Sequence, residues 1–200
     1  MTAEMVDAAF EATSVIPGFP EGAPFQQGEM VAYPSHGVGT VDRVGIEEVA
    51  GHRLNLIRVS FADNRMTLRI PVARAQSLGL RRLASPEALA AVLVTLRGRR
   101  RISKVMWAKR AQLYLGKINS GDVTALAEVV RDLQLGADGS GASSSQRNLF
   151  EIAIDRLAGE YAAASGIEKE TAMDLLTRTL RQGTSVEPEV IEDIEIAAAC

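Results

Sequence analysis

The chain has 200 residues, 46% of them apolar, which is enough to bury one large core or two small ones without disulfides or metals. Its only cysteine, Cys200, is the last residue, so an intramolecular disulfide and a cysteine-based metal site are excluded, and a reducing cytosol is expected. No apolar run approaches the roughly 20 residues that cross a bilayer, and residues 1–24 lack the basic start of a secretory signal. We therefore expect a soluble, cytoplasmic, globular protein.

The net charge of −3 hides a strong contrast along the chain. Residues 72–120 hold eleven bases against one acid, Glu87. By contrast, residues 1–24 hold four acids and residues 186–200 hold five, with no base in either segment. A basic stretch between acidic ends favours a polyanionic partner for the middle of the chain.

Strand patterns begin at Phe25, after a segment without sustained periodicity. Residues 1–24 are rich in Ala, Glu, Gly and Pro, so we predict a disordered N-terminal extension. Four β-type runs follow: EMVAYP, VGTVDRVG, RLNLIRVSF and MTLRIP. The third changes phase after Leu56, which predicts either a bulge or a strand buried on both faces. Residues 25–75 are therefore predicted to form a small β barrel.

Residues typical of helix starts and ends replace the strand pattern beyond Ala75. Ser85 and Pro86 predict the start of a helix over about 86–97, and a second helix should carry Trp107 and end near Gly121. Asp122 is placed to cap a third helix, the serines after GADGSGA a fourth, and Gly166 separates a fifth. We predict an all-α bundle over 85–181 and a disordered acidic tail over 184–200. The fold class is thus α+β, in two domains.

No constellation typical of an enzyme stands out. His36 and His52 lie at predicted strand ends, where structural turn contacts are the favoured interpretation. The glycines of HGVG have no nucleotide-loop spacing and fit tight turns. Asp122, Glu128 and Asp132 are interpreted as the solvated face of a helix. We predict no catalytic residue, no cofactor and no metal.

The basic stretch is the exception. It concentrates seven cations in fourteen residues, with no acid between them: Arg97, Arg99, Arg100, Arg101, Lys104, Lys109 and Arg110. Trp107, the only tryptophan, lies among them. One interpretation is a core indole beside a solvated basic face, and the pattern alone favours it. The other is a minor-groove wedge flanked by phosphate-binding cations.

Two long runs resemble one family of bacterial transcription regulators. VAYPSHGVGTVDRV and NRMTLRIPV are similar to the RNA-polymerase-interacting domain shared by CarD, CdnL and the transcription-repair coupling factor. MWAKRAQLYLGKINSGDVTALAEVVRDL resembles the helical domain of CarD/CdnL proteins, and it is the more specific of the two. The helicase motifs of the coupling factor are absent from the sequence, which favours a stand-alone regulator.

The resemblance implies a Tudor-like barrel that binds the β subunit of RNA polymerase and a helical domain that contacts promoter DNA at the upstream edge of the transcription bubble. It assigns polymerase binding to Val59, Arg69 and Pro71. Trp107 would be the wedge, and its indole is predicted to be partly exposed. Because an exposed ring contributes little packing, Trp107→Ala should leave stability nearly intact. The DNA-binding set is Arg99, Arg100, Arg101, Lys104, Trp107, Lys109 and Arg110. Glu47 and Glu48 stand where some relatives carry a base.

These features predict a monomeric, non-enzymatic regulator that stabilises the open promoter complex through minor-groove and phosphate contacts without reading sequence. It would be nucleoid-associated through RNA polymerase. An alternative is a protein-protein adaptor with a Tudor-like module that binds no DNA. An operator-specific regulator would need a recognition helix, which does not stand out. For the acidic ends, disordered solubilising tails are favoured over masking of the basic surface.

Overall fold

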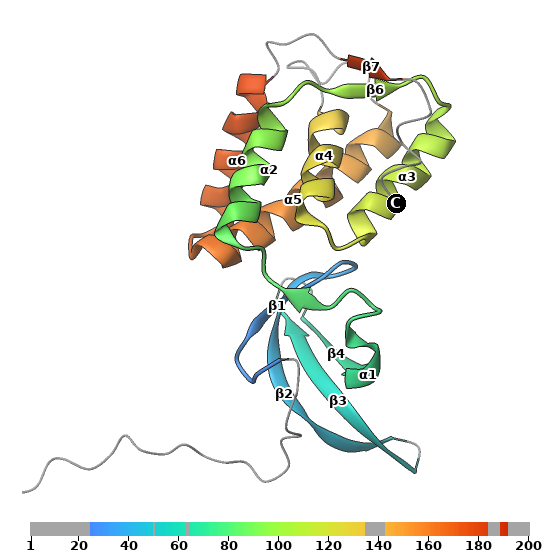
Figure 1. The fold of residues 1–200 in the computed structure, drawn as a ribbon, viewed down its shortest axis with the longest axis vertical. Coiled ribbons are helices and arrows are strands. Elements are labelled where there is room, and N and C mark those ends of the chain that lie inside the picture. Colours follow the sequence, from blue (N-terminus) through green and yellow to red (C-terminus); the bar gives the residue numbers. More distant parts are fainter. Residues whose placement is uncertain (1–24, 50, 63–64, 135–142, 184–188, 192–200) are drawn as a thin grey trace, which may run out of the picture.

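The computed structural model describes residues 25–49, 51–62, 65–134, 143–183 and 189–191. They form a sheet domain and a helical domain, each around a core of its own (Figure 1). The class is therefore α+β, as the change of hydrophobic period predicts. The predicted extension 1–24 lies outside the described residues, as does most of the predicted tail 184–200.

The sheet domain contains the four predicted strands and one more. Its strands pair antiparallel in the order β4-β3-β2-β1-β5. Their bounds are β1 Met30–Tyr33, β2 Gly37–Val49, β3 His52–Phe61, β4 Met66–Pro71 and β5 Arg81–Arg82. A one-turn helix, α1 (Val72–Ala75), follows β4. Since β5 joins this sheet, the domain extends beyond the predicted boundary at residue 75. The strands pair as one five-stranded antiparallel sheet from β4 to β5, and no pairing between β4 and β5 closes it among the described residues.

The sheet bends at a bulge in β2. The pairing of β2 with β3 shifts register between Val41 and Arg43, so Asp42 is the additional residue. Its carboxylate accepts a hydrogen bond of 2.7 Å from the Ser60 hydroxyl. In β3 the consecutive residues Leu56 and Ile57 are both buried. The phase change in the sequence of β3 therefore reflects burial on both faces, while the bulge belongs to its neighbour.

The glycines of the HGVG run have structural roles. Gly37 adopts a φ of +80°, which side chains disfavour. A Cβ on Gly39 would lie 2.6 Å from Cγ1 of Val59, so any larger residue would push β2 away from β3. His36 stacks on Tyr33 with ring centroids 5.6 Å apart. These residues thus build the β1–β2 turn and close the core, in agreement with the structural interpretation.

Three helices of the helical domain begin at the predicted caps. Its helices are α2 Pro86–Arg97, α3 Trp107–Asn119, α4 Val123–Leu133, α5 Ser144–Ser165 and α6 Lys169–Gly183. Ser85, Asp122 and Ser143 each accept a hydrogen bond from a backbone N–H in the first turn that follows. The prediction of an all-helical domain is wrong in one respect. β6 (Arg101–Ser103) pairs in parallel with β7 (Glu189–Ile191), which lies within the predicted disordered tail.

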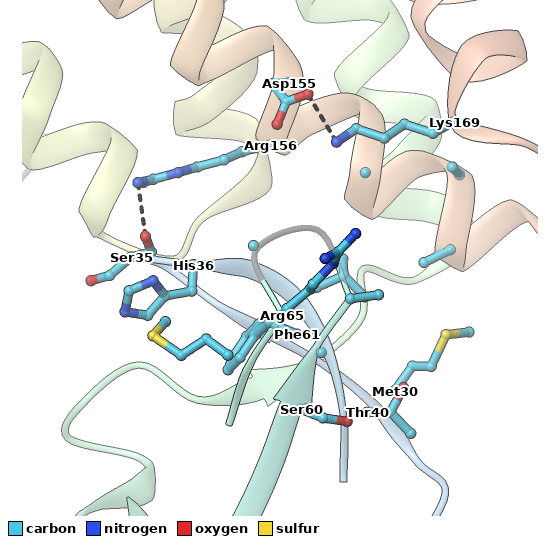
Figure 2. A pocket seen from close by; sticks show the side chains of 18 of the residues that line it. Met30, Ser35, His36, Thr40, Ser60, Phe61, Arg65, Asp155, Arg156 and Lys169 are labelled. Carbon is cyan, nitrogen blue, oxygen red and sulfur yellow. Dashed lines mark hydrogen bonds and ion pairs between the residues drawn. The ribbon is translucent and has the colours of Figure 1, made fainter. Parts of the chain in front are cut away.

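Polar contacts between α5 and the sheet domain hold the two domains against each other. Arg81 of β5 forms a bidentate ion pair of 2.5 and 2.9 Å with Glu160 of α5, whose side chain is 6% exposed. Arg156 of α5 donates to the carbonyl oxygen of Ser35 at 3.0 Å, as Figure 2 shows. Burial lowers the pKa of Arg156. These contacts hold α5, and with it the helical domain, to the β1–β2 turn.

Candidate nucleic-acid interface

The predicted DNA-binding residues lie on one continuous stretch of chain in the helical domain. We define the basic surface as the seven cations from Arg97 to Arg110 together with Trp107. It runs from the last residue of α2 through the loop 98–106, which contains β6, into the first turn of α3. Arg97, Arg99, Lys104 and Lys109 are exposed and have no acidic partner among the residues that the structure describes. Such a concentration of unpaired charge requires a polyanion or counterions.

The loop is held by an acid that the sequence analysis assigned to solvent. The Asp132 side chain, at the end of α4, is only 8% exposed. Its Oδ1 accepts hydrogen bonds from the backbone N–H of Arg101 at 2.9 Å and from Nε of Arg131 at 2.8 Å. Burial raises the pKa of Asp132, against the opposing effect of Arg131. The interpretation of Asp132 as part of a solvated face is therefore wrong, because it anchors the basic loop.

The two remaining acids of that set also have structural partners. Asp122 caps α4 by accepting from the N–H of Thr124 at 2.8 Å. Glu128 forms an ion pair of 2.6 Å with Lys117 of α3. Arg100 donates to the backbone carbonyl oxygen of Asp132 at 3.4 Å, close to the negative end of the α4 dipole. The acids of α4 thus tie α3 and the loop to the bundle and leave the exposed cations unneutralised.

Trp107 combines both interpretations of its indole. It is the first residue of α3, half-buried, and it packs against the helical core and against Tyr114, with ring centroids 6.5 Å apart. The guanidinium carbon of Arg110 lies 5.5 Å from its ring centroid, a cation–π contact. Arg110 in turn donates to the carbonyl oxygen of Ser103 at 3.2 Å. The ring is therefore fixed in orientation and remains partly open to solvent.

Met106 is an exposed apolar residue of the basic loop that the sequence pattern does not distinguish. It is the N-cap of α3 and is 80% exposed, next to Trp107. It makes no side-chain cap, and its backbone carbonyl oxygen accepts from the N–H groups of Lys109 and Arg110 at 3.1 and 3.2 Å. No capping residue marks the start of α3 in the sequence, so the exposed position of Met106 could not be predicted from a local pattern.

The predicted polymerase-binding residues lie at the other end of the molecule, on and beside the edge strand β4. Arg69 is 59% exposed and lies 3.5 Å from Glu47, which also binds Arg58 at 2.7 Å. Pro71 is half-buried. Val59 is completely buried in β3, between β2 and β4, so it supports the strand from within and presents no surface to a partner. A direct contact by Val59 is thus incompatible with the fold.

Glu47 itself lies in β2, opposite Leu54, and not in a turn. Its carboxylate pairs with Arg58 of the adjacent strand β3 and with Arg69 of β4, which lies beyond β3. β4 has a paired neighbour on one side only, so its other edge presents backbone N–H and C=O groups. The exposed side chains of this strand therefore alternate along an edge that a protein partner can approach.

Two further features of the described residues concern metal ligands and a cleft between the domains. In them no group of three or more His, Cys, Asp or Glu residues is placed to hold a metal ion. A cleft of about 810 Å³ lies between the β1–β2 turn and α5 (Figure 2). Two of its cations are already engaged, since Arg156 binds the turn and Lys169 pairs with Asp155 at 2.8 Å. A search of the same residues for helices long and apolar enough to cross a membrane gave none.

Both domains match known families in the order in which they occur. Residues 25–84 match the family model described as "CarD-like/TRCF RID domain", and residues 91–177 match "CarD, C-terminal domain". One relative, named "Putative transcription factor YdeB", from Bacillus subtilis (strain 168), is 24% identical over 146 residues, which are 73% of this chain and 95% of the relative. The family is one of transcription regulators and not a class of enzymes. The sheet domain followed by the helical domain, with the two matches that cover them, shows that this chain belongs to the CarD/CdnL family of transcription regulators.

Proposed function

We propose that the chain binds the β subunit of RNA polymerase through its sheet domain and stabilises the open promoter complex through DNA contacts of the basic surface. The observation that carries the proposal is the set of exposed, unpaired cations around a fixed, half-buried indole. Cations at this density bind phosphates without reading bases, because the contact releases counterions from any duplex. We further expect a monomer that acts in the cytoplasm and reaches the nucleoid through the polymerase.

Trp107 and Met106 give the surface an apolar point at the start of α3. An apolar wedge inserts most easily where a base step is already unstacked, as at the upstream edge of a transcription bubble. Lys104 and Lys109 flank this point and would hold the phosphates on either side. The wedge therefore favours melted over closed promoter DNA without a sequence preference.

The sheet domain supplies the location. Arg69 and Pro71 lie on β4, whose backbone edge is open to a further strand or to a protein surface. Docking there would turn a weak DNA contact into an intramolecular one. Sequence-independent DNA binding then acts only at promoters that polymerase already occupies.

The test is a salt titration of binding to forked promoter DNA, together with recovery of RNA polymerase. We expect Lys104→Glu/Lys109→Glu to weaken DNA binding about 30-fold and to lower the salt slope by about two, because each lysine releases about one counterion. Arg43→Glu/Arg53→Glu, which makes the same charge change on exposed residues of the sheet domain, is the matched control. A wild-type chain that recovers polymerase but shows no DNA binding at low salt would indicate the adaptor instead.

A further inference from the structure

The strand β7 pairs with β6, the strand inside the loop of the basic surface. Arg101, Ile102 and Ser103 of β6 pair in parallel with Glu189, Val190 and Ile191, as Figure 1 shows beyond the ends of α2 and α4. The other side of β6 faces α4, where Asp132 accepts from the N–H of Arg101. The loop is therefore held between the bundle on one side and a C-terminal segment of its own chain on the other.

The end of α6 brings this segment to the loop. A Cβ on Gly183, the last residue of α6, would lie 2.9 Å from the carbonyl oxygen of Arg97 and 3.0 Å from that of Leu96. The last residue of α6 thus touches the last turn of α2, where the basic surface begins. Glu189 follows only six positions later in the sequence. So short a connection keeps the segment at a high effective concentration near β6.

Charge matches this geometry. Residues 186–200 contain five acids and no base, whereas residues 97–110 contain seven bases and no acid. The pairing places Glu189 in register with Arg101. Opposite charges in neighbouring register positions stabilise strand pairing, and an acidic strand offers the loop the same sign of charge as a DNA backbone.

We propose that β6 is a docking edge for an extended acidic segment, and that residues 189–191 are its occupant, which competes with DNA for the basic surface. This proposal rests on the proposed function for the competition with DNA. The solubilising role that the sequence analysis favours for the C-terminal end is replaced here, at residues 189–191, by an intramolecular contact. A pairing of three residues is weak, so many phosphate contacts displace it once the protein is tethered at a promoter.

The first test asks whether the contact forms, without DNA. In the full chain, Val190→Pro/Ile191→Pro removes two backbone donors and disrupts the strand but keeps every charge. Hydrogen exchange of the amides of residues 98–106 should become at least several-fold faster than in the wild type. Ala198→Pro/Ala199→Pro carries the same two prolines outside β7 and should leave this exchange unchanged. Equal exchange in the two variants, with equal melting temperatures, would overturn the proposal.

The second test measures competition with DNA. We expect Val190→Pro/Ile191→Pro to bind forked DNA about tenfold more tightly than the wild type at low salt, with the difference shrinking as salt screens both contacts. Addition of DNA to the wild type should remove exchange protection from residues 189–191. Equal DNA affinity of the wild type and the strand variant would overturn the competition while the DNA contact stands. Absence of DNA binding by both forms would contradict the proposed function and, with it, the competition.

A third variant separates charge from strand pairing. Glu187→Gln/Glu189→Gln keeps the backbone of β7 and removes two negative charges, and it should raise DNA affinity by a smaller factor than the proline variant does. Glu4→Gln/Glu11→Gln changes the net charge equally at the other end of the chain and is the control. If the control raises DNA affinity as much as the tail variant, only net charge is at work, and the docking proposal is wrong.

Discussion

The fold treats the arginines of the sheet domain and those of the helical domain in opposite ways. Arg58 and Arg69 converge on one carboxylate, that of Glu47, at 2.7 and 3.5 Å. Arg97, Arg99, Lys104 and Lys109 of the basic surface have no acidic partner within the described residues. The nearby carboxylate of Asp132 accepts a hydrogen bond from the backbone of the loop instead. The exposed arginine of the edge strand β4 thus has an acidic partner within its own domain. The exposed cations of the loop keep their full charge, which is the condition that binding to a polyanion requires.

The largest expected effect is the loss of stability when Asp132, which holds the basic loop, is replaced. Asp132→Ala removes the acceptor of two hydrogen bonds and leaves Arg131, which is 7% exposed, without its partner. Removing one member of a buried pair costs about 3 kcal/mol of unfolding free energy. Urea unfolding measures this loss, and DNA binding should fall with it because the loop is no longer held.

The amide variant tests whether shape or charge is responsible. Asp132→Asn keeps an oxygen acceptor for the N–H of Arg101, so it should cost less than about 1 kcal/mol and retain most DNA binding. If the alanine variant unfolds at the same urea concentration as the wild type, Asp132 does not anchor the loop. In the sheet domain, Glu47 differs from Asp132 because its carboxylate pairs with the side chains of Arg58 and Arg69.

Trp107→Ala should act on both stability and function. The indole is half-buried against the helical core, so the sequence-based expectation underestimates the loss of stability. We expect Trp107→Ala to lower the free energy of unfolding by about 1–2 kcal/mol. The lifetime of the open promoter complex should shorten several-fold while RNA polymerase is still bound. Leu113→Ala, a half-buried residue of the same helix, is the control for stability loss alone. Equal lifetimes for the two variants would contradict the wedge.

Arg69→Glu tests the sheet side of the comparison. The change places two carboxylates next to each other at Glu47 on a surface position, so stability should change by less than about 0.5 kcal/mol. Retention of RNA polymerase in co-purification should nevertheless fall about fivefold, and DNA affinity should stay the same. Arg43→Glu, on an exposed position of β2, is the control. Unchanged retention in a folded variant would remove Arg69 from the polymerase-binding set.

Local signals explain most of what the sequence could predict. The caps at Ser85 and Asp122 and the alternation in β1 to β4 depend on neighbouring residues, so both are legible in a single sequence. β5 and β6 are two and three residues long and exist only through partners far along the chain, such as β1 and β7. The burial of Val59 and of Asp132 likewise depends on contacts between distant elements. The loop and its charge were thus predictable, whereas its anchor was not.

The smallest expected effect is the pH dependence that Asp132 contributes. Burial raises the pKa of its carboxyl above the ordinary value of 3.8, so the folded protein holds this proton more tightly than the unfolded chain does. Stability from this group is therefore fully present below the unfolded pKa and is lost as the pH rises through the folded pKa. The amide of Asp132→Asn cannot titrate, so this variant lacks the pH-dependent contribution of the carboxyl group to stability.

The measurement is the difference in unfolding free energy between the wild type and Asp132→Asn, followed from about pH 3 to about pH 7, in which the other carboxyl groups cancel. The wild type should lose stability relative to the amide variant as the pH rises. A difference that grows in favour of the wild type instead would mean that Arg131 and the N–H of Arg101 stabilise the carboxylate by more than burial disfavours it. In that case Asp132 would be an ion-pair partner like Glu47, and the contrast between the two domains would rest on the exposed cations alone.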